Sequence, residues 1–406
     1  MTRRSDARAR WGAIGALVLV VLVVAVGRRM ATETLPPLLT HRTLAADVRV
    51  PGNAPVLAWP REGQAAVDVE GVGRLGGWGG ITPVPIASVA KVMTAYLTLQ
   101  GHPLAAGKQG FVMTITSADV EELEQRVAEG QSTLPVRAGE RLTERQALQA
   151  LLVPSANNIA ALLAVYDAGS EAAFVSRMNA TARKLGMSST TYTDQSGFND
   201  GTVSTAVDQL TLARVAMRTR AFAAIVDERS ADLPVAGTVG NFDALVGRDG
   251  YVGVKTGSDR AAGGCLVFAK HVTIDGRAVT VLGVVLGQRE GSLIEAALSS
   301  AQRLGDSAAA ALHPVTVLHA HTSVLNVSNV SGGQTVAVTT NALWEIGWDG
   351  MVLPVHVLAG TAVTRLRAGQ RVATVSVRGT GVVATAAVGT SALGGPSLWW
   401  RLGHLF

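Results

Sequence analysis

The sequence predicts an α+β fold: a mixed α and β domain that is followed by a small all-β domain and preceded by one membrane-spanning helix. Three observations predict it. Residues 11–27 are apolar and uncharged, residues 47–312 combine strand-like with helix-like runs, and short β-branched runs take over after residue 313. The chain has 406 residues, 48% of them hydrophobic, which suffices for a sizeable core in more than one domain.

The first element is the run WGAIGALVLVVLVVAVG at residues 11–27. As a helix it would be about 26 Å long, close to the ~30 Å hydrocarbon core of a bilayer. By the positive-inside rule, the arginines before it place residues 1–10 in the cytoplasm and everything after residue 28 outside. Arg28 and Arg29 directly follow the small residues at which cleavage is conceivable, which favours an uncleaved anchor over a removed signal peptide. The arginines before the run are Arg3, Arg4, Arg8 and Arg10.

Residues 28–46 are expected to be a linker, because the paired prolines of TLPPLLTH and the absence of a clear period argue against a packed element. The mixed domain at 47–312 contains strand-like runs such as GRAVTVLGVVLG (276–287). It also contains helix-like runs such as LIEAALSSAQRLGDSAAAAL (293–312).

Residues 313–395 contain several short β-branched runs, including GQTVAVTT and QRVATVSVRG, separated by glycine and polar turns. This spacing predicts a small β-sandwich or barrel. The aromatic tail at residues 396–406, PSLWWRLGHLF, suits either an interfacial membrane contact or packing against the preceding domain.

Charge and cysteine content exclude several classes of function. The net charge is +5 with basic residues spread along the chain, which suits an anionic envelope or membrane surface, and no compact basic run indicates nucleic-acid binding. Cys265 is the only cysteine, so an intrachain disulfide and a cysteine-based zinc site are excluded. Its apolar surroundings in GGCLVFA predict a buried, structural thiol.

The first candidate functional pair is in PIASVAKVMTAYL (85–97), where Ser88 and Lys91 are three residues apart in an apolar run. On a helix, residues i and i+3 project from one face, so the amine can reach the hydroxyl. A serine beside a base is an activated nucleophile. A lysine with an ordinary pKa near 10.4 is protonated at neutral pH, so it can act as the base only if burial and a second cation lower its pKa.

Two further segments add polar groups to this pair. LLVPSANNIAALLA (151–164) places Ser155 and Asn157 at the start of an apolar run. GYVGVKTGSDRAAGGCLVFA (250–269) places Lys255, Thr256 and Gly257 at the end of a strand-like run. Lys255 is the second cation that the pair requires, and Gly257 is expected to let a ligand lie close against the strand.

The order S-x-x-K, S-x-N, K-T-G resembles the serine D-alanyl-D-alanine carboxypeptidases, which are low-molecular-mass penicillin-binding proteins of the peptidase S11 family. The resemblance extends over most of residues 47–312. It implies a β-lactamase/transpeptidase-like domain, in which an antiparallel sheet is flanked by helices and the cleft lies beside a helical subdomain. The other similar stretches are VRAGERLTERQALQALLVPSANNIAA (136–161), MNATARKLGMSSTTYTDQSGFND (178–200) and STAVDQLTLARVA (204–216).

The resemblance implies a membrane-anchored, extracytoplasmic hydrolase that removes the terminal D-alanine from peptidoglycan stem pentapeptides through a Ser88 acyl-enzyme. It implies no metal and no cofactor, and β-lactams as covalent inhibitors. Three alternatives stay open: a D,D-endopeptidase, a β-lactamase of the same fold, or a catalytically idle envelope scaffold.

The resemblance also assigns roles to single residues. Ser88 matches the nucleophile, Lys91 the general base, and Ser155 a proton relay toward the leaving amine. Asn157 matches a donor that holds both Lys91 and the substrate amide. Lys255 and Thr256 match the grip on the terminal carboxylate, and the oxyanion is expected between the backbone N–H groups of Ser88 and Ser258.

Three positions depart from the family pattern. Asn158 stands where an aspartate is frequent, which puts local hydrogen bonding in doubt. Ser258 follows K-T-G where many members have histidine, so substrate preference is expected to differ. Arg289 is near, but not at, the spacing of an arginine that some members present to the substrate carboxylate, and its role stays open.

Overall fold

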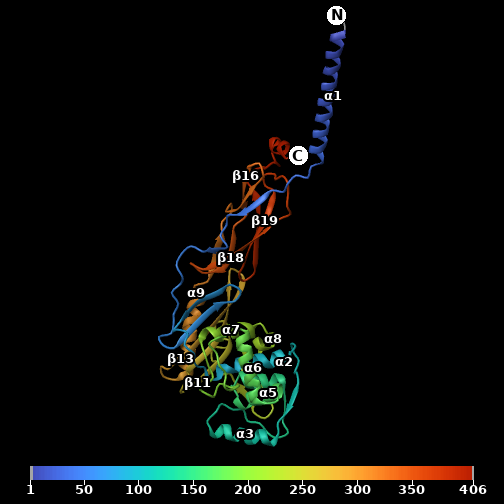
Figure 1. Cartoon of the computed structure of the whole chain (residues 1–406). Coiled ribbons are helices and arrows are strands. Elements are labelled where there is room, and N and C mark those ends of the chain that lie inside the picture. The colour runs from blue at the N-terminus through green and yellow to red at the C-terminus, as the bar shows by residue number, and fades with distance from the viewer. Residues whose placement is uncertain (1–2, 405–406) are drawn as a thin grey trace. The chain divides into compact units, whose positions relative to one another are not determined.

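The structure is a computed structural model that describes residues 3–404, and the side chains of residues 10–404. Figure 1 shows the course of the chain. The chain divides into two compact units. We call residues 51–315 and 346–351 the mixed unit, and the rest, residues up to 50, 316–345 and from 352 onward, the β unit.

Helix α1 (Arg3–Thr32) contains the predicted apolar run. Its segment Arg10–Thr32 is long and apolar enough to cross a membrane, and none of its apolar window is buried in the protein. This agrees with a membrane anchor, and a secretion signal would have the same length and composition. The predicted cytoplasmic segment 1–10 falls partly outside the described residues, because residues 1–2 and the side chains of the first three arginines are not described.

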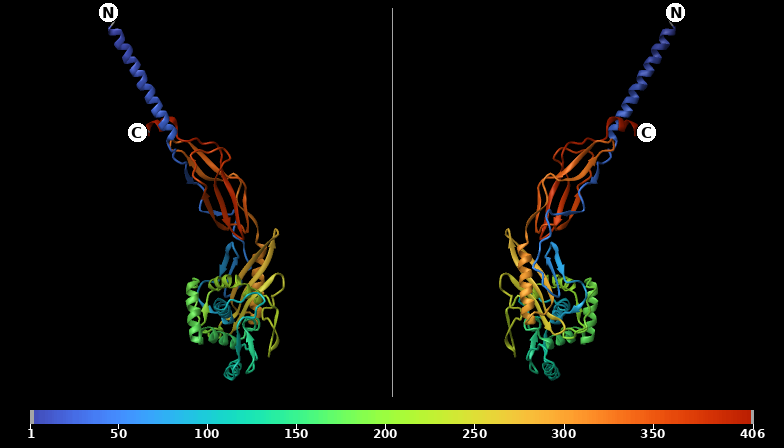
Figure 2. Two further views of the ribbon diagram at one scale, coloured as in Figure 1. Left: turned by 90° about the vertical axis from the view of Figure 1, so that its right-hand side faces the viewer. Right: turned by 90° about the vertical axis from the view of Figure 1, so that its left-hand side faces the viewer.

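The centre of the mixed unit is an antiparallel five-stranded sheet in the order β11-β12-β13-β3-β4. Strands β12 and β13 are joined by the turn Asp275-Gly276, where both residues have positive φ, as a two-residue hairpin requires. Helix α9 lies along the β12–β13 side of the sheet (Figure 2), and small residues on its buried face permit close packing. The bounds are β3 (Gln64–Val69), β4 (Gly73–Trp78), β11 (Tyr251–Asp259), β12 (Gly263–Ile274), β13 (Arg277–Gln288) and α9 (Leu293–Ala310).

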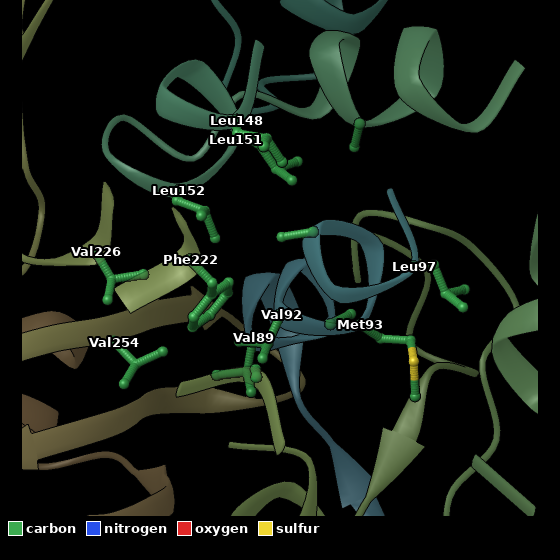
Figure 3. Close-up of a cluster of buried hydrophobic side chains, with 14 of the residues drawn as sticks. Val89, Val92, Met93, Leu97, Leu148, Leu151, Leu152, Phe222, Val226 and Val254 are labelled. Atoms are coloured by element: carbon green, nitrogen blue, oxygen red, sulfur yellow. The ribbon is translucent and has the colours of Figure 1, made fainter. Parts of the chain in front are cut away.

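A helical subdomain is inserted between β4 and β11. Its helices bury a common apolar cluster, in which Val89 and Val92 lie with Leu151, Phe222 and Val254 (Figure 3). Helices α3 and α4 each begin with a capping box, which supplies partners for the free N–H groups of the first turn. The helical elements are η1 (Ala87–Ala90), α2 (Lys91–Gly101), α3 (Ser117–Ala128), α4 (Glu144–Leu152), α5 (Asn157–Ala168), α6 (Glu171–Lys184), α7 (Ala206–Met217) and α8 (Arg220–Val226). The short strands, which pair in twos, are β5 (Val84–Pro85) with β8 (Val203–Ser204), β6 (Val112–Thr114) with β7 (Arg141–Thr143), and β9 (Ser230–Leu233) with β10 (Gly237–Gly240).

The β unit is built on an antiparallel seven-stranded sheet in the order β1-β15-β16-β20-β19-β18-β2. Its inner strands alternate buried and less buried residues, the pattern of a sheet with one covered face. The bounds are β1 (Leu39–Arg42), β2 (Asp47–Arg49), β15 (Ser323–Ser328), β16 (Gln334–Thr339), β18 (Val352–Ala359), β19 (Arg371–Arg378) and β20 (Val382–Gly389), with β14 (His313–Leu318) and β17 (Leu343–Gly347) forming a separate pair.

The prediction of an unpacked linker at residues 28–46 is wrong for residues 28–32, which continue helix α1, and for residues 39–42. Residues 39–42 form β1, which pairs with β15 in register, Leu39 opposite Ser328. Residues 47–49, which the sequence assigned to the mixed domain, form β2 and pair with β18. Both are short edge strands whose partners lie some 280 to 300 positions further along the chain, so local pattern gives no sign of them.

The aromatic tail begins with a short helix, α10 (Leu398–Gly403), capped by the Ser397 hydroxyl. The Trp399 side chain is 82% exposed, so it is not packed against the β unit. Arg401 pairs with Glu33, just beyond the end of α1, at 3.1 Å. Phe406 lies outside the described residues.

The predicted fold class is confirmed: a mixed unit with an antiparallel sheet, an all-β unit and one N-terminal apolar helix.

Candidate active site

Ser88 and Lys91 are held together by local helix geometry. Ser88 is in the 3₁₀ turn η1, and Lys91 is the first residue of α2, so the two side chains project from the same face. Lys91 Nζ donates to Ser88 Oγ at 2.6 Å and to the Ser196 carbonyl oxygen at 3.1 Å. The predicted nucleophile and base are therefore in direct contact.

The backbone before the nucleophile is strained. Ala87 has φ 47°, a left-handed conformation that residues with a Cβ rarely adopt. Gly197 lies directly against it, since a Cβ there would be 1.8 Å from the Ala87 carbonyl oxygen. The close fit of the segment around Gly197 maintains the unusual turn that presents Ser88.

Burial controls the charge of Lys91. Its side chain is 0% exposed, and desolvation lowers its pKa well below the ordinary value, with Lys255 and then Arg126 lowering it further. Asp194 opposes these effects and raises the pKa. The net result favours the neutral amine, which is the form that can accept the Ser88 proton.

Lys255 and Thr256 are on β11, and both are buried. Lys255 Nζ donates to the Thr256 carbonyl oxygen at 3.0 Å. Desolvation lowers the Lys255 pKa to about 7, and the nearby Asp243 carboxylate opposes that shift. Lys255 is thus the second cation beside Lys91 that the sequence required.

Gly257 has a different role from the one expected. A Cβ on Gly257 would be 2.9 Å from the Ser88 nitrogen and 3.0 Å from the Ile86 carbonyl oxygen. The group that lies close against the strand is therefore the backbone of the nucleophile turn itself. Ser258 follows, half-buried, one residue further along β11.

Ser155 and Asn157 are at the turn between α4 and α5. Ser155 has φ 65°, and its Oγ is buried without a hydrogen-bond partner among the described residues. Asn157 Nδ2 donates to Gln131 Oε1 at 2.8 Å, while its Oδ1 is buried and has no such partner. The expected role of Asn157 as a donor to the site stays a prediction, because one Nδ2 N–H donates to Gln131 and an amide nitrogen has a second N–H.

Asn158 explains one departure from the family pattern. Its Oδ1 accepts from the Leu134 N–H at 2.9 Å, and its Nδ2 donates to the Leu134 carbonyl oxygen at 3.0 Å. An amide can make both bonds, whereas a carboxylate can make only the first. The chain segment before α4 is also held by the Asn157 N–H, which donates to the Ser132 carbonyl oxygen at 2.8 Å.

Arg289 is engaged at a turn. Its guanidinium donates to the carbonyl oxygens of Arg260 and Ala261, at 2.9 and 2.5 Å, in the β11–β12 turn. These contacts give Arg289 a structural role in closing the sheet edge.

Sequence reasoning missed Arg126, Gln131 and the Ser196 carbonyl as parts of the site. Ser196 and Asp194 are in the segment TDQSGFND, where Asp194 Oδ2 accepts from the Ser196 hydroxyl at 2.6 Å. Arg126 and Gln131 are in a polar stretch without a motif, so only the tertiary structure reveals their contacts.

Comparison with known proteins identifies the family. The model of the D-alanyl-D-alanine carboxypeptidase family, peptidase S11, matches residues 81–290. The chain belongs to this family. It is accordingly a serine-type D-Ala-D-Ala carboxypeptidase, a peptidase of the hydrolase class.

Among curated relatives, D-alanyl-D-alanine carboxypeptidase DacB2 of Mycobacterium tuberculosis is 32% identical over 225 residues, which are 53% of this chain and 72% of the relative. The D-alanyl-D-alanine endopeptidase of Pseudomonas aeruginosa is 38% identical over 136 residues, 33% of this chain and 40% of the relative.

Among solved structures, the Streptomyces K15 DD-transpeptidase aligns with a TM-score of 0.52 at 28% identity, covering 64% of this chain and 98% of the other. The peptidoglycan synthesis regulatory factor (PBP3) from Streptococcus pneumoniae aligns with a TM-score of 0.60 at 21% identity, covering 83% of this chain and all of the other, and shows the fold alone.

Proposed function

We propose that this carboxypeptidase cleaves the bond between the two terminal D-alanines of peptidoglycan stem pentapeptides, with Ser88 as the nucleophile and Lys91 as its base. The observation that carries the proposal is the 2.6 Å contact between Ser88 Oγ and a fully buried amine whose pKa burial lowers. Complete burial is unfavourable for a charged amine and does not stabilise the fold. A lysine that is nevertheless fully buried therefore indicates that its neutral form is used in function.

In acylation, Ser88 Oγ bonds to the peptide carbonyl carbon as its proton passes to Lys91 Nζ. The carbonyl oxygen becomes an oxyanion, which the Ser88 and Ser258 backbone N–H groups stabilise. The tetrahedral intermediate then expels the terminal D-alanine, whose nitrogen receives a proton through Ser155. Water hydrolyses the resulting Ser88 ester and returns the hydroxyl.

The unpartnered Ser155 Oγ supports this relay, because a buried hydroxyl without a partner is costly in the free protein and is satisfied when a reacting group occupies the site. Lys255 and Thr256 are proposed to hold the terminal carboxylate of the substrate. A charged ammonium beside a hydroxyl is suitable chemistry for that group, and a bound carboxylate would raise the Lys255 pKa and keep it protonated.

A D,D-endopeptidase that cuts cross-links is the second candidate, because a relative of that name shares 38% identity over part of the chain. The same nucleophile, base and oxyanion donors serve both reactions, and the size of the group accepted beyond the scissile bond distinguishes them. Incubating the enzyme with a pentapeptide monomer and with a cross-linked dimer, and comparing kcat/KM by chromatography, separates the two.

For location, we propose that α1 stays in the membrane and that the rest of both units, from residue 33 onward, is outside the cytoplasm, where peptidoglycan is. The span Arg10–Thr32 and the arginines before it support this orientation. Reporter fusions at residue 2 and residue 404 test it. The expected result is a periplasm-active reporter only at the C-terminal fusion, and an N-terminal sequence that starts after residue 28 would show cleavage instead.

The deciding experiment for the chemistry is mass spectrometry of the full chain in detergent after incubation with benzylpenicillin, beside Ser88→Ala. A penicilloyl adduct on the Ser88 peptide that disappears in the variant is the expected result. Folded protein without an adduct and without penicillin turnover would overturn the proposal in favour of an idle scaffold. Rapid turnover without accumulation would indicate a β-lactamase.

A further inference from the structure

The orientation of the Asn157 amide is a feature that the S-x-N motif alone does not determine. A side-chain amide presents a donor on one side and an acceptor on the other, and a 180° rotation exchanges them. Here Nδ2 donates to Gln131 Oε1 at 2.8 Å, and Oδ1 is the atom left buried without a partner among the described residues. The atom of the Asn157 amide that bonds to Gln131 therefore determines which of its atoms, Oδ1 or Nδ2, faces the active site.

The orientation of Gln131 is fixed in turn by two charged neighbours. Arg126 Nη1 donates to Gln131 Oε1 at 3.4 Å, and Gln131 Nε2 donates to Glu129 Oε2 at 2.6 Å. A guanidinium can only donate, and a carboxylate can only accept. Reversing Gln131 would place donor against donor and acceptor against acceptor, so its Oε1 must point to Arg126 and to Asn157.

Arg126 is itself held in place. Its side chain is only 14% exposed, its Nε donates to Glu122 Oε1 at 3.0 Å, and its Nη2 lies 3.3 Å from Glu171 Oε1. The other oxygen of Glu171 accepts from Gln195 Nε2 at 2.7 Å, and Gln195 is next to Ser196, the carbonyl partner of Lys91. The ion pairs thus connect α3 and α6 to the segment behind the catalytic amine.

Lys91 needs the acceptor that this arrangement leaves free. Its Nζ already donates to Ser88 Oγ and to the Ser196 carbonyl oxygen. When it takes the Ser88 proton it becomes an ammonium with three N–H groups, and a buried ammonium requires a partner for the third. Asn157 Oδ1 is a buried acceptor without a hydrogen-bond partner among the described residues. Asn157 shares Gln131 with Arg126, whose charge lowers the Lys91 pKa, which supports placing this acceptor near Lys91.

We propose that Arg126 and Gln131 are positioning residues that fix the rotamer of the Asn157 amide, so that its oxygen, and not its nitrogen, is available to the Lys91 ammonium formed during acylation. The inference rests on the proposed function of Ser88 and Lys91. The inference goes beyond that function because it assigns Arg126 of α3 and Gln131 after α3 a role in positioning the active site. It also predicts that the hydrogen-bonding polarity of residue 131 controls the acylation rate.

The first test reverses that polarity. Gln131→Glu presents only acceptors to Asn157, whereas Gln131→Lys presents only donors and turns the Asn157 nitrogen toward Lys91. We expect the benzylpenicillin acylation rate to fall less than about threefold in Gln131→Glu and by about 10- to 100-fold in Gln131→Lys. Acylation rates are compared at the plateau of each pH profile, because a changed charge near Lys91 shifts the Lys91 pKa and would otherwise alter the rate at a fixed pH.

The second test is a double-mutant cycle with the neutral change Gln131→Met. If Gln131 acts through Asn157, Gln131→Met slows acylation by about tenfold in the parent and has no further effect in Asn157→Ala. Arg126→Ala, measured at its own plateau, should show the same dependence on Asn157. Arg177→Ala is the matched control, because the guanidinium of Arg177 on α6 pairs with Asp167 of α5 at 2.5 Å, and the variant should acylate at the parent rate.

Two results would overturn the inference: equal rates in Gln131→Glu and Gln131→Lys, or a full additive loss when Gln131→Met is combined with Asn157→Ala. Thermal unfolding identifies a variant that fails to fold, and Arg126→Lys then replaces Arg126→Ala. Failure of the proposed function is distinct, since the parent protein itself would form no Ser88 adduct.

Discussion

The two units bury different kinds of residue. In the β unit, β19 alternates between a covered face, which carries Ala373, Val375 and Val377, and a more open face with Thr374 and Ser376. In the mixed unit, β11 is buried along most of its length although it carries Lys255, and Lys91 is completely buried on the neighbouring helix. The β unit thus buries mainly apolar residues and threonines, with Glu345 as a charged exception, while the mixed unit buries both lysines of the motif segments.

The exceptions cluster at the proposed site. The left-handed residues Ala87 and Ser155 and the buried lysines Lys91 and Lys255 are in the three motif segments. Each is unfavourable for folding, because strained backbone and desolvated amines both cost free energy. Such local violations are expected where function, and not stability, selects the residue. The following substitutions test whether the mixed unit carries the chemistry while the β unit contributes only to stability.

Ser88→Ala should have the largest effect. It removes the nucleophile, so hydrolysis of a D-Ala-D-Ala peptide should fall by at least about 1,000-fold and the penicilloyl adduct should disappear. The thermal unfolding temperature of the variant should be close to that of the parent, because removing a half-buried hydroxyl leaves no enclosed cavity. An adduct on another residue of the variant would contradict the assignment.

Lys91→Met should separate activity from stability. We expect acylation to fall by about 10²- to 10⁴-fold, because the base is lost. The free energy of unfolding should rise by about 1–2 kcal/mol at pH 7, since an apolar side chain replaces a desolvated amine.

The sign of the pH dependence follows from the lowered pKa of Lys91. In the unfolded chain, Lys91 binds a proton below its ordinary pKa of 10.5, whereas the buried residue in the folded protein stays neutral until a lower pH. The folded parent therefore loses stability as the pH falls from 10.5 toward the lower pKa of the folded state. The advantage of Lys91→Met should therefore grow as the pH is lowered from about 10. Denaturant unfolding at several pH values measures it, and a variant less stable than the parent at every pH would contradict the expectation.

The pH profile should report Lys255. Its pKa in the free enzyme is about 7, and only the protonated form attracts a carboxylate. Above that pH, kcat/KM should fall toward a slope of about tenfold per pH unit, as the charged fraction of Lys255 decreases. Lys255→Arg stays charged, so its profile should lose this alkaline limb even if its maximum rate is lower. A limb that persists in Lys255→Arg would belong to another group.

Val375→Ala in β19 should have the smallest effect on chemistry. Val375 is fully buried in the β unit, so the truncation should cost about 1–3 kcal/mol of stability there. Benzylpenicillin acylation should change by less than about twofold, because distant independent sites contribute separately. A marked loss of acylation without unfolding would show that the β unit takes part in the chemistry.

The sequence could predict the parts of the site that depend on short-range geometry. Ser88 and Lys91 meet because they are three residues apart in a helical turn, and their apolar neighbours already imply the burial that lowers the Lys91 pKa. The alternating run at 276–287 likewise predicted β13, and the helix-like run at 293–312 predicted α9, each within a few residues.

What the sequence could not predict depends on contacts between distant segments. The segment LTHR has no alternation, and becomes β1 only because β15 supplies the hydrogen bonds. Gln131 is an ordinary polar loop residue until Asn157 and Arg126 are brought to it. Gly257 looked like room for a ligand, because nothing in the sequence shows that the Ser88 backbone lies against it.

The pairing of β1 with β15 also has a consequence for the order in which the protein is made. β1 follows the apolar helix and leaves the ribosome early, but its partner, residues 323–328, is synthesised only after residues 51–315, the larger part of the mixed unit. Because domains fold as units while the chain grows, residues 51–315, which hold the three motif segments, can fold while β1 is still unpaired. The β unit closes last, and a nascent chain halted before residue 323 should already bind penicillin while its first strand is still accessible to protease.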